Sequence, residues 1–164
     1  MTEYTRPATW EDVKTVARAL AAEGVEYALI GGYAIAAHGY NRFSEYVDIL
    51  VNPSRENTRR WIRALGTLPD HASLELQGED DVMEGEGPPA VRINDEFTVD
   101  VMGAACGHTW DELKGHIIEV ELDETPVRLL DLEGLLLTKE GLRDKDRADA
   151  LVLRRALEKL RTPR

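Results

Sequence analysis

Two aspartates, Asp48 and Asp100, lie within apolar segments whose alternating pattern is typical of β-strands. The segment 45–51 has apolar side chains at every second position, and Asp100 stands between two valines in the segment 97–102. A charged residue inside an apolar strand is costly unless it is paired or bound to a metal. On neighbouring strands, two such carboxylates could hold Mg²⁺, which prefers one or two protein carboxylates together with substrate phosphates. The alternative interpretation is that both side chains point to solvent from a half-exposed sheet.

A pair of glycines, Gly31-Gly32, follows a short apolar segment, 26–30, and precedes an Ala-rich segment, 33–38, that favours a helix. This order of strand, Gly-Gly and helix exposes backbone N–H groups at the positive end of a helix dipole, where a phosphate can approach closely. Most Gly-Gly pairs are only turns, so the motif by itself is a weak indication of phosphate binding.

The surrounding pattern predicts the elements that would position these residues. Thr9 is the expected N-cap of a helix that Gly24 ends, and Asn52-Pro53 the expected cap and first turn of a helix through Leu65. Further predictions are a hairpin of 90–93 and 97–102 with its turn at 94–96, strands at 45–51, 117–122 and 127–130, and helices at 131–142 and 145–160. Mixed strands, hairpins and helices favour an α/β (α+β) fold with a mixed, largely antiparallel sheet flanked by helices.

Length and composition narrow the class of protein. The 164 residues fit a single domain, 1–164, and no apolar run is long enough to span a bilayer, so we expect a cytoplasmic protein with no membrane partner. The formal net charge of −11 argues against non-specific DNA binding, which requires Lys and Arg to displace phosphate counterions. The acidic segment 78–89 is expected to be a mobile loop, and Cys106 a small buried side chain.

The run 30–49 resembles the signature of the nucleotidyltransferase superfamily with the polymerase-beta-like fold. It is most similar to the minimal nucleotidyltransferases and the related AbiEii-type abortive-infection toxins. In that family a Gly-Gly or Gly-Ser pair opens a helix, an Arg-x-Thr/Ser follows, and an Asp-x-Asp lies on the next strand. The residues that match, in chain order, are Gly31-Gly32, Arg42-x-Ser44, Asp48, Asp100 in Val99-Asp100-Val101, and Lys139-x-x-x-Arg143-x-x-Asp146-x-x-Asp149.

The resemblance implies binding of an NTP with Mg²⁺ or Mn²⁺, and transfer of NMP to a hydroxyl of a protein, a tRNA or a small molecule. It implies that Asp48 and Asp100 are catalytic metal ligands. It also implies phosphate contacts from Gly31, Gly32, Arg42, Ser44 and Lys139. Many relatives belong to toxin–antitoxin or phage-defence pairs, so the resemblance also implies a protein partner.

One position departs from the family pattern, because the first Asp of Asp-x-Asp aligns with Tyr46. Residues 44, 46 and 48 share one face of the strand, so Glu45 points the other way and does not substitute. A neutral phenol, with a pKa of about 10, is a poor Mg²⁺ ligand at pH 7. Tyr46 at this catalytic position therefore predicts impaired activity. Three explanations stay open: a degenerate member that acts as a binding or antitoxin-like module, an Asp-to-Tyr variant, or a wrong alignment register.

Overall fold

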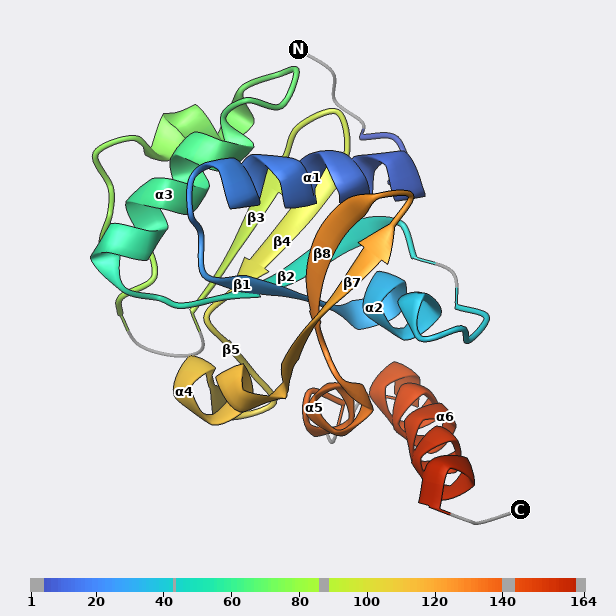
Figure 1. The fold of residues 1–164 in the computed structure, drawn as a ribbon. Coiled ribbons are helices and arrows are strands. Elements are labelled where there is room, and N and C mark those ends of the chain that lie inside the picture. Colours follow the sequence, from blue (N-terminus) through green and yellow to red (C-terminus); the bar gives the residue numbers. More distant parts are fainter. Residues whose placement is uncertain (1–4, 43, 86–88, 140–143, 162–164) are drawn as a thin grey trace.

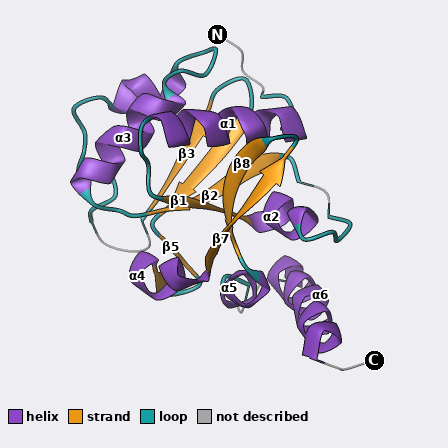
Figure 2. Ribbon diagram, in the orientation of Figure 1, coloured by secondary structure: helices purple, strands orange, loops and turns teal. Residues whose placement is uncertain are grey.

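A six-stranded sheet with helices on both of its faces forms the centre of the protein (Figures 1 and 2). The computed structural model describes residues 5–42, 44–85, 89–139 and 144–161. The strand order is β3-β4-β2-β1-β8-β7. The strands are β1 (Tyr27–Ile30), β2 (Tyr46–Val51), β3 (Ala90–Asn94), β4 (Thr98–Met102), β7 (Ile117–Leu122) and β8 (Thr125–Leu130).

Three neighbouring strand pairs are antiparallel, namely β1–β2, β3–β4 and β7–β8, whereas β2–β4 and β1–β8 are parallel. The predicted mixed, largely antiparallel sheet is therefore confirmed. The helices are α1 (Trp10–Ala22), α2 (Gly31–Ala37), α3 (Arg55–Leu65), α4 (Trp110–Leu113), α5 (Leu132–Leu137) and α6 (Asp144–Arg161). Helices α1 and α3 cover one face of the sheet, and α2, α5 and α6 lie on the other side (Figure 1). Among the described helices, none is long and apolar enough to cross a membrane.

Helix α1 begins at the predicted N-cap. The Thr9 hydroxyl accepts a hydrogen bond from the Asp12 backbone N–H, and the Asp12 carboxylate accepts one from the Thr9 N–H at 2.8 Å, which completes a capping box. Burial alone would raise the pKa of Asp12, but hydrogen bonds from Arg6 and Thr9 outweigh it and hold that pKa below its usual value.

The predicted start of α3 is wrong by two residues. Ser54, not Asn52, is the N-cap, because the Ser54 hydroxyl accepts a hydrogen bond from the Asn57 N–H at 3.2 Å. The Asn52 side chain instead accepts from the Ser54 N–H at 3.0 Å and so forms a local turn before the helix. The predicted end near Gly66 is confirmed.

The core-facing side of the two middle strands is apolar, as the alternation predicts. Val47 and Ile49 of β2, and Val99 and Val101 of β4, have no exposed surface. The side chains between them therefore emerge on the opposite face of the sheet. That geometry fixes which residues can form a site there.

Other elements differ from the sequence-based expectations. The β7–β8 hairpin is longer than predicted because Asp123 and Glu124 both adopt positive φ, which allows a two-residue turn. Helix α5 ends at Leu137, and residues 140–142 of the predicted helix lie outside the described residues. Cys106 was expected to be buried but is exposed, in a two-residue turn between the short strands β5 (Ala104–Ala105) and β6 (His108–Thr109).

Candidate functional site

The two aspartates predicted from sequence lie side by side. In the parallel pairing of β2 with β4, Asp48 is the direct register partner of Asp100. In the antiparallel pairing of β1 with β2, Asp48 is also the partner of Ile30, the last residue of β1. Directly opposed residues on neighbouring strands have their side chains on the same face, about 5 Å apart at Cβ. The two carboxylates therefore converge on one face of the sheet, beside the point where α2 leaves it.

Gly31 lies against the Asp48 carboxylate. Its backbone has φ +72°, a left-handed conformation that glycine adopts without strain. A Cβ at this position would stand 2.3 Å from Asp48 Oδ2, a distance that two non-bonded atoms do not reach. The absence of a side chain at Gly31 is thus what lets the Asp48 carboxylate approach the start of α2. Gly32, the next residue, lies in the first turn of that helix.

An arginine that the sequence reasoning missed completes the row across the sheet. Arg92 of β3 is the register partner of Asp100, so Ile30, Asp48, Asp100 and Arg92 lie in one line across four strands. Arg92 Nε lies 2.8 Å from Asp100 Oδ1, and Arg92 Nη2 lies 3.1 Å from Asp100 Oδ2. This is a bidentate ion pair that engages both oxygens of the carboxylate.

Tyr46 lies next to this ion pair. The Arg92 guanidinium carbon is 4.9 Å from the centre of the Tyr46 ring, within the range of a cation–π contact. Hydrogen bonds and the charge of Asp100 hold the pKa of Arg92 above its usual value, and the charge of Asp48 acts in the same direction. Tyr46 and Asp48 emerge on the same face of β2, so the phenol stands beside the two carboxylates.

The basic residues predicted to contact phosphates form a second cluster. Arg42 Nε donates to Asp149 Oδ1 at 2.8 Å, and Lys139 Nζ lies 3.2 Å from Asp149 Oδ2. Asp149 belongs to α6, and 6% of its side chain is exposed, against 27% for Arg42 and 11% for Lys139. Asp149 therefore holds the ends of two distant segments together in a largely buried ion-pair cluster.

Ser44, the remaining predicted contact, is engaged with the backbone of its own strand. Its hydroxyl donates to the Tyr46 carbonyl at 2.8 Å and accepts from the Tyr46 N–H at 3.4 Å. This geometry is a local turn at the entrance to β2. The structure thus brings together Gly31, Asp48, Asp100 and Tyr46, and it ties Arg42 and Lys139 to α6. Arg143 and the Asp146 side chain, which also match the family pattern, lie outside the described part of the chain.

Asp48 and Asp100, side by side on β2 and β4, form what we call the aspartate row. The metal-binding groups at this row do not fit a centre for two Mg²⁺ ions. Such a centre needs several anionic oxygens. Here Tyr46 stands at the first acidic position of the family pattern and provides a phenol instead of a carboxylate, and Asp100 is already paired with Arg92. Within the described ranges, there is no group of three His, Cys, Asp or Glu side chains arranged to hold a metal. Asp48 and Asp100 together can supply ligands to at most one hard cation that also binds substrate phosphates.

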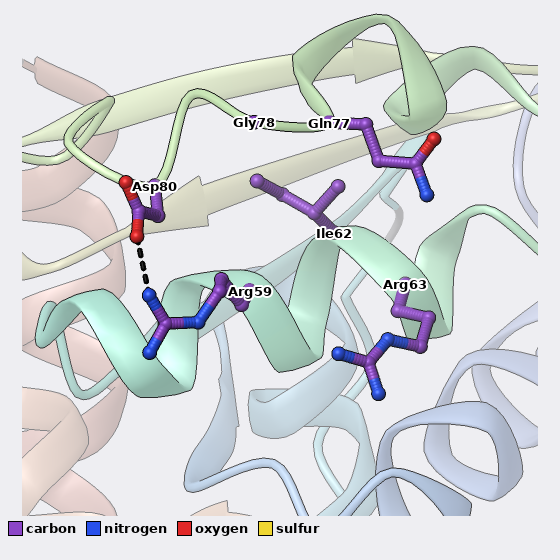
Figure 3. Close-up of a pocket in the computed structure, with 6 residues that line it drawn as sticks. All are labelled: Arg59, Ile62, Arg63, Gln77, Gly78 and Asp80. Atoms are coloured by element: carbon purple, nitrogen blue, oxygen red, sulfur yellow. Dashed lines mark hydrogen bonds and ion pairs between the residues drawn. The ribbon is translucent and has the colours of Figure 1, made fainter.

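A small pocket lies elsewhere, beside α3 (Figure 3). Its walls are Arg59, Ile62 and Arg63 of α3, together with Gln77 and the first residues of the acidic segment, Gly78 and Asp80. Arg59 forms an ion pair with Asp80 across it. Helix α3 covers the sheet face opposite to α2 (Figure 1). The pocket is therefore separate from the aspartate row.

Strand order and helix placement are those of a nucleotidyltransferase-like fold. Among solved structures, the chain shares this fold with a candidate nucleotidyltransferase (TM1012) from Thermotoga maritima. The TM-score is 0.58 at 16% sequence identity, and the match covers 93% of this chain and 89% of that chain. An antigenic nucleotidyltransferase-like protein from Paracoccidioides brasiliensis matches with a TM-score of 0.48 at 17% identity, over 90% of this chain and 77% of that one. The fold assignment rests on the first likeness alone.

No protein-family model matches the sequence, and a search of curated proteins finds no match either. At 16% identity the structural likeness establishes the fold. The fold that the sequence resemblance implied is therefore confirmed. The closer kinship with abortive-infection toxins stays a prediction.

Proposed function

We propose that this chain binds a nucleoside triphosphate, together with one Mg²⁺ or Mn²⁺ ion, on the face of the sheet where Asp48 and Asp100 lie beside Gly31. The observation that carries the proposal is the register pairing of Asp48 with Asp100 in a nucleotidyltransferase-like fold. Two adjacent carboxylates suit a hard cation that brings its remaining ligands from phosphate oxygens. Gly31 keeps the approach to Asp48 open, because any side chain there would collide with that carboxylate.

The cluster of Arg42 and Lys139 supplies positive charge for the triphosphate in this proposal. Asp149 orders both cations through its two carboxylate oxygens. A triphosphate would gain from two preorganised cations, since the cost of ordering long side chains has already been met in folding.

The reaction proposed for such a site is attack by a hydroxyl of a protein, a tRNA or a small molecule on the α-phosphorus of the NTP, which transfers NMP and releases pyrophosphate and the hydroxyl proton. We expect it to be slow in this chain. Tyr46 presents a phenol where a carboxylate would supply an anionic oxygen, and Arg92 competes for Asp100. Loss of charge stabilisation at one such position ordinarily lowers the rate by about 100-fold or more.

Binding and transfer are tested separately. Isothermal titration with ATP and Mg²⁺ should show binding that weakens about tenfold or more in Asp48→Asn, through loss of a cation ligand, and in Asp100→Asn, which leaves the Arg92 charge without this carboxylate beside the cation. Unchanged affinity in both variants would rule out the proposed location.

Transfer is measured with NTP labelled at the α-phosphate and candidate acceptors. Tyr46→Asp should raise incorporation by about tenfold or more, whereas Tyr46→Asn, which places a side chain of the same size as Asp but without charge, should not. Equal rates in the two variants would show that the acid at position 46 is not what limits transfer.

A second candidate function is a binding module that has lost transfer activity and acts on a protein partner, as an antitoxin-like protein does. The bidentate Arg92–Asp100 pair beside Tyr46 favours it, because this pair is electrically balanced without a metal. It predicts no transfer by the native chain, and partner binding that persists in Asp48→Ala. Measurable turnover by the native chain would contradict it.

A further inference from the structure

We propose that Arg92 is a built-in cation that takes the place of a divalent metal at Asp100, and that Tyr46 holds it there. The inference deepens the proposed function and rests on it for the identity of the ligand, since it states why the site accepts at most one metal ion. Asp48 is then the carboxylate at which a cation arriving with the nucleotide would bind.

The position of Arg92 is set by strand pairing rather than by chance contact of a long side chain. β3 and β4 are paired over five residues from Ala90–Met102 to Asn94–Thr98, and Arg92 and Asp100 are the central partners. Directly opposed residues of opposite charge interact favourably on one sheet face. The guanidinium is therefore delivered to Asp100 by the same register that places Asp100 beside Asp48.

The contact with Asp100 uses both carboxylate oxygens, at 2.8 and 3.1 Å. A metal that bound Asp100 would have to displace at least one of these hydrogen bonds and would meet a fixed positive charge a few ångströms away. Two unit charges of the same sign about 4 Å apart repel strongly enough to weaken binding by tenfold or more where water is partly excluded. Asp100 has 20% of its side chain exposed, so the site is partly shielded from water.

Tyr46 replaces the Asp that the family pattern has at this position, and it also contacts Arg92. An Asp at this position would contribute a third carboxylate to the row, whereas the phenol ring contributes a face on which the guanidinium rests at 4.9 Å. Arg92 offsets the charge of Asp100 within their ion pair. Three carboxylates without Arg92 would favour a pair of divalent ions. Tyr46 and Arg92 therefore act in the same direction, toward fewer bound metal ions.

The test is a Mn²⁺ titration with no nucleotide present, in which electron paramagnetic resonance measures the concentration of the free ion. Arg92→Gln should bind Mn²⁺ about tenfold more tightly than the native chain. The matched control is Arg55→Gln, because Arg55 also forms a bidentate pair with a carboxylate, that of Glu84, and belongs to α3, the helix that covers the other face of the sheet. It makes the same change in net charge and should alter Mn²⁺ affinity by less than about threefold.

Three further variants assign the effect. Asp100→Asn combined with Arg92→Gln should abolish the gain in Mn²⁺ affinity. Arg92→Lys should bind Mn²⁺ almost as weakly as the native chain. Tyr46→Asp combined with Arg92→Gln should bind Mn²⁺ more tightly than either single variant. The proposal is overturned if Arg92→Gln binds no more tightly than Arg55→Gln, or if the gain persists without Asp100. Since Arg92 is half-exposed on an edge strand, its variants should have the same melting temperature as the native chain.

Failure of the nucleotide proposal is distinguishable from failure of this one. If the native chain binds no ATP but Arg92→Gln binds Mn²⁺ more tightly, the proposed function is contradicted and the role of Arg92 is supported. A chain that binds ATP with unchanged Mn²⁺ affinity in all variants would support the proposed function and overturn the role of Arg92.

Discussion

At the scale of single residues, the contact between Gly31 and Asp48 makes a sharp prediction. Gly31→Ala introduces both a strained positive φ and a Cβ 2.3 Å from Asp48 Oδ2. Gly39 is a matched control, because it also has positive φ, at +95°, but a Cβ there would meet nothing within 4 Å. We expect Gly39→Ala to lower the free energy of unfolding by about 1 kcal/mol, and Gly31→Ala to lower it by about 2–3 kcal/mol, since overpacking adds to the strain.

Urea denaturation of the two variants measures the difference. Equal losses would show that the Asp48 carboxylate moves aside at little cost. In that case the close approach of Gly31 to Asp48 would not be a constraint on the site.

Asp149 gives a second prediction at this scale. Asp149→Asn removes the negative charge of the side chain that both Arg42 and Lys139 contact. Breaking a buried ion pair from one side ordinarily costs about 3–5 kcal/mol. We expect a loss toward the lower end, about 3 kcal/mol, because Arg42 is 27% exposed and can reach water.

The comparison is Glu84→Gln, which removes one partner of an exposed bidentate pair with Arg55. Thermal and urea unfolding should show a much smaller change in this variant, since water compensates an exposed charge. Similar losses in the two variants would mean that the Asp149 cluster does not differ energetically from a surface ion pair.

Residue types and spacing predict part of this site but not its partners. Asp48, Asp100 and Gly31 are recognisable because each breaks a local pattern: a charge in an apolar strand, or a glycine at a strand end. Arg92 breaks no pattern, because an arginine on an edge strand is ordinary, and only the β3–β4 register places it opposite Asp100. The Asp149 cluster joins Arg42 to a residue 107 positions away, and no local signal predicts such a contact.

At the scale of elements, the described residues of the acidic segment after α3 are attached to that helix by ion pairs. Glu84 forms a bidentate pair with Arg55 at 2.7 and 2.9 Å, and Asp80 pairs with Arg59 one turn further along. Met83, between the two acids, is buried. The mobile loop was predicted from the composition of the segment and its lack of periodicity. Neither feature reveals that Arg55 and Arg59 of α3 face the segment. Residues 86–88 of that expected loop lie outside the described ranges.

We expect the double variant Arg55→Gln, Arg59→Gln to loosen this segment selectively. Backbone amides in 79–84 should exchange hydrogen about tenfold faster than in the native chain, whereas those of β1 and β2 should not change. Hydrogen exchange followed by mass spectrometry measures both regions in one experiment. Unchanged exchange in 79–84 would show that burial of Met83 alone fixes the segment.

Element boundaries could be predicted where side chains carry the signal. The capping box at Thr9 and the alternation of β2 and β4 gave the correct elements. The misplaced cap of α3 has a physical cause, because Asn52 and Ser54 are both good capping residues and only the three-dimensional turn decides between them. Helix α4 has four residues and a capping box of its own, Thr109 with Glu112, which the sequence contains and the prediction overlooked.

At the scale of the whole molecule, charge separates this protein from general nucleic-acid binders. The net charge of −11 opposes any long-range attraction to DNA, and several surface arginines are paired with acids. We expect no binding to a fluorescent DNA duplex of about 30 base pairs at micromolar protein in roughly 100 mM KCl, measured by anisotropy with a basic protein as positive control. A salt-dependent rise in anisotropy in that range would contradict this expectation.

The place of β1 in the sheet has a consequence for biosynthesis. β1 pairs on one side with β2, which follows it closely in the chain, and on the other side with β8, where Leu29 meets Leu129. While the chain emerges from the ribosome, the apolar strand Tyr27–Ile30 therefore keeps one open edge until β8 has been made. Open apolar edges recruit other chains. A newborn copy is thus most prone to aggregate before β8 appears, and a chaperone would act in that interval.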